Sequence, residues 1–96
     1  MSESKIVKIE IIANHSMEME IVSLFDTLYP ELGYTYVPNI LGKGKSGFRR
    51  GDAVWPESNF YLFSFCSTEE AQTLRKAVEG VKRNFPKEGI KVFIHI

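Results

Sequence analysis

Hydrophobic and polar residues alternate in two segments, one near each end of the chain. Residues 5–13 are rich in β-branched side chains, and Lys8 and Glu10 lie on the polar side of the alternation. The apolar side of this segment carries Val7, Ile9 and Ile11. Residues 90–96 alternate in the same way. This period of two predicts a half-buried first strand and a similar last strand.

Two other segments carry apolar residues at helical spacing. Ser16 is a suitable N-cap for the first predicted helix, and Pro30 and Gly33 are expected to end it. Its apolar stripe is Met17, Ile21, Leu24, Phe25 and Leu28. Ser67 and Glu70 form a capping box for the second helix, because Ser and Glu lie three residues apart. The inward side of this helix is Ala71, Leu74, Val78 and Val81.

Two strands are predicted between these helices. Residues 34–41 contain Pro38, which cannot donate to a strand ladder, so this strand is expected at a sheet edge. Residues 60–66 are apolar enough for a central strand. The order β-α-β-β-α-β predicts a single α+β domain over residues 1–96, with the ferredoxin-like plan. With both helices on one sheet face, outward aromatics such as Tyr61 and Phe63 need cover, which predicts an oligomer.

The composition narrows the classes of function. Lysine and arginine total 12, as do aspartate and glutamate, so the formal net charge is zero. A neutral chain is unlike a general nucleic-acid binder, which needs an excess of cations. Cys66 is the single cysteine, which excludes an internal disulfide and a multi-cysteine zinc site. Neither an apolar leader nor a membrane-spanning stretch is evident in the sequence, so we expect a cytoplasmic protein.

The segment from Gly42 to Asn59 contains two strings that imitate nucleotide-binding motifs. Its first three glycines satisfy G-x-G-x-x-G, but no helical periodicity follows, and that fingerprint needs a helix N-terminus at the phosphate. The run Gly44-Lys45-Ser46 resembles the end of a P-loop, but the first glycine of that motif would fall on Asn39. We therefore assign neither a dinucleotide fold nor a P-loop.

The same segment nevertheless has the chemistry of an anion-binding loop. Closely spaced glycines let backbone N–H groups converge, and four cations add positive charge. The candidate ligand- or partner-binding residues are Gly42, Lys43, Gly44, Lys45, Ser46, Gly47, Arg49, Arg50, Gly51 and Trp55. Trp55 has two readings, an intersubunit or ligand-stacking position and a cap on the core. A solvated hairpin tip is the alternative for the loop itself, although loops longer than about 12–15 residues are usually functional or disordered.

The element order and this loop resemble the PII signalling family, whose T-loop joins the second and third strands. The likeness lies in a hydrophobic strand, a Gly-x-Gly, a basic run and a closing Arg-Gly, here within residues 37–51. The resemblance implies a homotrimer with ligand clefts between subunits, binding of adenine nucleotides, and docking of the loop on a regulated enzyme or membrane transporter. The family's second glycine-rich loop corresponds to residues 85–91, which keep only Lys87, Gly89 and Lys91.

Two alternatives remain beside this interpretation. The related CutA-like trimers are associated with divalent metals, and His15 with Glu18 or Glu57 is the candidate ligand set. An enzyme on the same fold ranks last, because the sequence indicates no nucleophile beside a base. Cys66 is expected to be a small buried side chain rather than a nucleophile.

Overall fold

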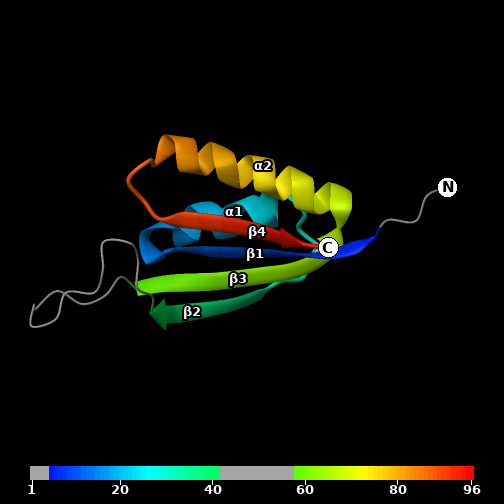
Figure 1. The fold of residues 1–96 in the computed structure, drawn as a ribbon, viewed down its shortest axis with the longest axis horizontal. Helices are drawn as coiled ribbons and strands as arrows, with labels where there is room; N and C mark the ends of the chain where they lie inside the picture. The colour runs from blue at the N-terminus through cyan, green and yellow to red at the C-terminus, as the bar shows by residue number, and fades with distance from the viewer. Residues whose placement is uncertain (1–4, 42–57) are drawn as a thin grey trace, which may run out of the picture.

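The computed structural model describes residues 5–41 and 58–96. Its elements follow the predicted order, with one additional short turn of 3₁₀-helix (Figure 1). They are β1 (Ile6–Asn14), η1 (His15–Met17), α1 (Glu18–Leu28), β2 (Thr35–Leu41), β3 (Ser58–Ser67), α2 (Thr68–Asn84) and β4 (Ile90–His95). None of the described helices is long and apolar enough to cross a membrane.

The four strands form one antiparallel sheet in the order β2-β3-β1-β4. β1 lies in the centre and pairs with β3 on one side and β4 on the other. Each helix therefore connects two strands that run in the same direction with a third strand between them. Figure 1 shows α1 and α2 on the same side of the sheet. This is the ferredoxin-like α+β fold that the element order predicts.

The core lies between this sheet and the two helices. Val7, Ile9 and Ile11 of β1 are buried, as the alternation predicts. β3 contributes Phe60 and Leu62 to the same layer. From the helices come Ile21, Phe25, Ala71, Leu74 and Val78. Burial of these apolar side chains stabilises the fold by roughly 25 cal/mol for each Å² removed from water.

The start of the first helix differs from the prediction. The Asn14 side chain, not that of Ser16, caps this turn, because Asn14 Oδ1 accepts a 2.9 Å hydrogen bond from the Ser16 N–H. Ser16 Oγ instead donates to Glu88 Oε1 at 2.7 Å. Both asparagine and serine are good caps, so their sequence positions alone do not decide between them. The capping box of α2 is confirmed, with both of its reciprocal bonds between Ser67 and Glu70.

β2 is an edge strand, as Pro38 predicts, and β3 is central. The pairing of β2 with β3 shifts register between Val37 and Ile40, next to the proline. Proline supplies no N–H to a ladder, so an irregularity at this point is physically expected.

Candidate functional site

One end of the sheet brings together the segments that carry the predicted binding residues. Leu41, the last residue of β2, pairs with Ser58, the first residue of β3, so residues 42–57 begin and end at this end of the sheet. The turn between α2 and β4 lies at the same end, because Ile90 pairs with Ala13 near the end of β1 (Figure 1).

Gly89 is held at this end by a backbone bond, its carbonyl accepting a 2.9 Å hydrogen bond from the Asn14 N–H. A Cβ added at Gly89 would meet no atom of residues 5–41 or 58–96 within 4 Å, and its backbone does not adopt a positive φ. The turn itself therefore does not require glycine, and none of the described residues fills the space beside it. Lys87 and Lys91 flank it, and both are exposed.

The other predicted binding residues, from Gly42 to Trp55, lie outside the described residues, as does Glu57. Their roles stay predictions. The structure fixes only where their segment leaves and re-enters the sheet.

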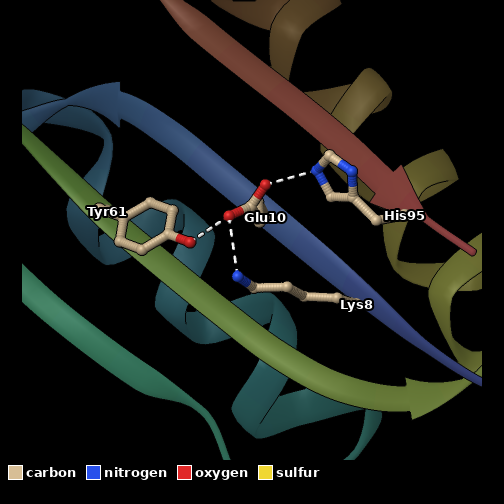
Figure 2. A network of polar contacts seen from close by, with 4 residues as sticks. All are labelled: Lys8, Glu10, Tyr61 and His95. Carbon is tan, nitrogen blue, oxygen red and sulfur yellow. Dashed lines mark hydrogen bonds and ion pairs between the residues drawn. The ribbon is translucent and has the colours of Figure 1, made fainter.

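The sheet face away from the helices carries a network of polar contacts (Figure 2). The Glu10 carboxylate lies at its centre. Its Oε1 lies 2.5 Å from His95 Nε2, and its Oε2 lies 3.2 Å from Lys8 Nζ. The Tyr61 hydroxyl also donates to Oε2. Because these residues come from β1, β3 and β4, the network ties three adjacent strands together.

The electrostatics of this network favour a charged carboxylate. The hydrogen bond from Tyr61 is the main cause that lowers the pKa of Glu10, and Lys8 and His95 act in the same direction. The hydrogen bond to Glu10 likewise raises the pKa of Lys8. Burial, followed by the hydrogen bond to Glu10, raises the pKa of Tyr61. Lys8 and Glu10 are therefore an ion pair at neutral pH.

Apolar and aromatic side chains surround the network on what we call the open face. This face consists of the outward positions of β1, β3 and β4, namely Ile6, Lys8, Glu10, Ile12, Tyr61, Phe63, Phe65, Lys91, Phe93 and His95. Phe65 is 60% exposed and Phe93 is 46% exposed. Lys8 Nζ lies 4.7 Å from the centroid of the Phe63 ring, a cation–π distance. Tyr61 and Phe63 of β3 lie on this outward side, as predicted, because they pair with Ile12 and Glu10 of β1.

Sequence reasoning predicted the outward positions of Lys8, Glu10 and Tyr61 but not their convergence. The alternation assigns each residue to a face, whereas the contact with His95 depends on the register of β4 against β1. That register pairs Lys8 with His95 and Glu10 with Phe93. The missing signal was the pairing of acidic and basic residues between the first and last strands.

The metal-site residues of the CutA-like alternative are only partly brought together. His15 Nε2 lies 3.8 Å from Glu18 Oε1, an ion-pair distance. Within residues 5–41 and 58–96, no group of three His, Cys, Asp or Glu side chains is arranged to hold a metal. Cys66 is buried, as expected, and burial raises the pKa of its thiol.

Two shallow hollows occur at the other end of the sheet, away from Leu41. One, of about 410 Å³, is lined by Gly33, Tyr34, Thr35, Phe63, Ser64 and Phe65. The other, of about 360 Å³, is lined by residues 28–32 and Glu70. Neither hollow contains a predicted binding residue.

Similarity to known proteins is visible in three dimensions rather than in sequence patterns. No protein-family model matches the chain, and no curated protein matches it by sequence. Among solved structures, it is similar to CPII, a nitrogen regulatory PII-like protein of Thiomonas intermedia bound to ADP, AMP and bicarbonate. The TM-score is 0.69 at 26% identity, over 94% of this chain and 87% of that one.

Two further structures extend this likeness. CPII bound to ADP and bicarbonate gives a TM-score of 0.65 at 26% identity, covering 97% of this chain and 89% of that one. A PII-like signalling protein of Thermus thermophilus shares the fold with a TM-score of 0.64 at 19% identity, covering 94% and 84%. Element order and fold agree with these solved structures, so the chain has the fold of PII-like proteins and is similar to them.

Proposed function

We propose that this chain is a cytoplasmic, non-catalytic PII-like regulatory protein that assembles as a homotrimer and binds an anionic small molecule, an adenine nucleotide foremost. The observation that carries the proposal is the geometry of one sheet end. There Gly89, beside which the described residues leave open space, lies at the same end as the two points where residues 42–57 leave and re-enter the sheet.

Charge and backbone chemistry support an anion at this end. Lys87 and Lys91 are exposed beside Gly89. Lys43, Lys45, Arg49 and Arg50 belong to the segment that starts there. Phosphate groups suit such a site, because ammonium and guanidinium groups form charge-assisted hydrogen bonds with them. The relative CPII is bound to ADP and AMP in its structures, which makes adenine nucleotides the first ligands to test.

The open face supports assembly. Phe65, Phe93 and Ile6 are large apolar side chains that water contacts in a single copy. Contiguous exposed apolar surface on a sheet is typical of an interface between proteins. In a trimer of the PII type, clefts between subunits would lie next to the segment 42–57. The same segment would also contact a regulated enzyme or membrane transporter.

Isothermal titration calorimetry with ADP, AMP and ATP tests the ligand, with bicarbonate as a further titrant. We expect saturable binding, weakened roughly tenfold or more by Lys45→Ala, Arg50→Ala or Lys87→Ala, since each removes a charge-assisted hydrogen bond. Lys76→Ala is the matched control, because Lys76 is an exposed lysine of α2 outside this sheet end. Absence of binding to every one of these anions at millimolar concentration would refute the ligand proposal.

A further inference from the structure

We propose that the network of Lys8, Glu10, Tyr61 and His95 determines how copies of this chain meet at the open face, with Glu10 as the residue that permits burial of the two basic side chains. The inference rests on the homotrimer proposed above and specifies what its interface recognises. Its occupant is a second copy of the same face.

The charges of the network favour a second copy over a charged partner. Lys8 and Glu10 neutralise each other at 3.2 Å, and His95 adds a charge only when it is protonated. A nucleic acid or an acidic peptide would have to compete with Glu10 for the same cations. The centre of an identical face is neutralised in the same way and meets no such competition, and Lys91, at the end of the face near Ile12, is the cation left outside the Lys8–Glu10 pair.

The depth of the side chains indicates what an approaching copy contacts first. Glu10 has 20% of its side chain exposed, against 32% for Lys8 and 57% for His95. The side chains of Lys8 and His95 are therefore more exposed than the Glu10 carboxylate that both contact. An ammonium group has three donors, and Glu10 accepts from one of those of Lys8. Lys8 also interacts with the Tyr61 hydroxyl and lies over the Phe63 ring, so the network holds its ammonium group at the surface that a second copy would cover.

Burial of the open face under a second copy makes the Glu10 carboxylate necessary for assembly. A charged group transferred into an interface without its partner carries a large desolvation cost, whereas an ion pair that is already formed carries less. Removal of Glu10 alone would leave Lys8 uncompensated under the neighbouring copy. Removal of Lys8 and Glu10 together would leave a more apolar face that still associates, without the ion pair that fixes its register. A polar group in an apolar interface is known to fix register and oligomer state in this way.

These two substitutions therefore have different expected results. Sedimentation equilibrium should show one uniform trimer for the wild type. For Glu10→Ala we expect association weakened roughly 100-fold or more, the size typical for loss of one partner of a buried pair. For the double variant Lys8→Met/Glu10→Leu we expect association to persist but to yield a mixture of oligomers.

Two controls separate assembly from folding. Glu20→Ala removes an exposed carboxylate of α1, off the open face, and should leave the trimer unchanged. Glu10→Gln keeps the shape of the side chain and its ability to accept the Tyr61 hydrogen bond while removing the charge. The Glu10→Gln variant should assemble more weakly while its circular dichroism spectrum stays unchanged. It replaces Glu10→Ala as the test if Glu10→Ala does not fold.

The outcomes distinguish this inference from the proposed function. A wild-type chain that is monomeric at all concentrations would overturn the homotrimer, and the inference with it. A trimeric wild type whose Glu10→Gln variant assembles with equal affinity would overturn the inference alone. A Lys8→Met/Glu10→Leu variant that forms the same uniform trimer would show that the network does not set the register, and would also overturn it.

Discussion

Ser64 is the buried polar side chain of the described core, and it links β3 to the segment just before β2. It lies on β3 with 2% of its surface exposed, and its Oγ donates a 2.6 Å hydrogen bond to the Gly33 carbonyl. This bond holds the chain just before β2 against its neighbouring strand. A hydroxyl that is buried in an apolar layer contributes only when such a partner is present.

Replacement of Ser64 by alanine should lower the free energy of unfolding by about 1 kcal/mol, since it removes one hydrogen bond and leaves the Gly33 carbonyl without that donor. Urea titration followed by circular dichroism measures the change. Ser23→Ala is the control, because Ser23 is exposed on α1 and alanine is a better helix former. An equal effect of the two substitutions would contradict this role for Ser64.

Tyr36 gives the fold a dependence on alkaline pH. Burial, and then its hydrogen bond to the Glu18 carboxylate, raises the pKa of Tyr36 to about 12. The unfolded chain releases this proton near pH 10, whereas the folded chain keeps it. The stabilisation is thus complete below about pH 10 and is lost as the pH rises towards 12.

A Tyr36→Phe variant should therefore lose less stability than the wild type between pH 10 and pH 11.5, by on the order of 1 kcal/mol. Chemical denaturation at pH 8, 10 and 11.5 measures the two slopes. Some alkaline dependence should remain in the variant, because the pKa values of Tyr34 and Tyr61 are also raised, mainly by burial. Identical slopes for variant and wild type would exclude this role of Tyr36.

At the scale of elements, local chemistry in the sequence was sufficient to predict most of the fold. The alternation around Ile9, the capping box of Ser67 and Glu70, and Pro38 each depend on neighbours within a few residues. The cap of the first helical turn was wrongly assigned to Ser16. The hydroxyl of Ser16 instead bonds to Glu88, a residue distant in the sequence. Choices between two competent caps depend on such tertiary contacts.

The outer edge of β2 provides a test at this scale. Pro38 lies in an edge strand, beside the register shift, and both features make this strand an irregular template for another strand. Pro38→Val should therefore raise light scattering of the heated protein roughly severalfold, since a regular edge pairs more readily with other chains. Pro30→Val, in the connection after α1, is the matched control. Equal scattering from the two variants would contradict the protective role of Pro38.

At the scale of the whole molecule, the predicted site divides into a part the structure places and a part it does not describe. The sequence predicted that residues 42–59 join the second and third strands. The pairing of Leu41 with Ser58 confirms the connection, although β3 begins two residues earlier than predicted, at Ser58. It did not predict that Glu10 and His95 meet, because cross-strand contacts follow from register. Roles for Lys45 and Arg50 stay predictions, because a loop's composition indicates a ligand class rather than a geometry.

The exposed aromatics of the open face give the last prediction. If copies cover this face, folding and assembly are linked, and mass action makes the unfolding temperature depend on protein concentration. For a trimer of this size, a tenfold higher concentration should raise the apparent Tm by on the order of 4 °C. Differential scanning calorimetry over a hundredfold concentration range measures this dependence.

Substitution within the open face distinguishes assembly from the stability of one chain. Phe65→Ser should weaken assembly and lower the apparent Tm most at low concentration, because Phe65 lies on the open face and contributes little to the core of a single copy. Met19→Ser is the matched control, since Met19 is 77% exposed on α1, in the helical layer. A Tm that is independent of concentration in the wild type, or equal effects of the two substitutions, would mean that the open face is not where copies meet.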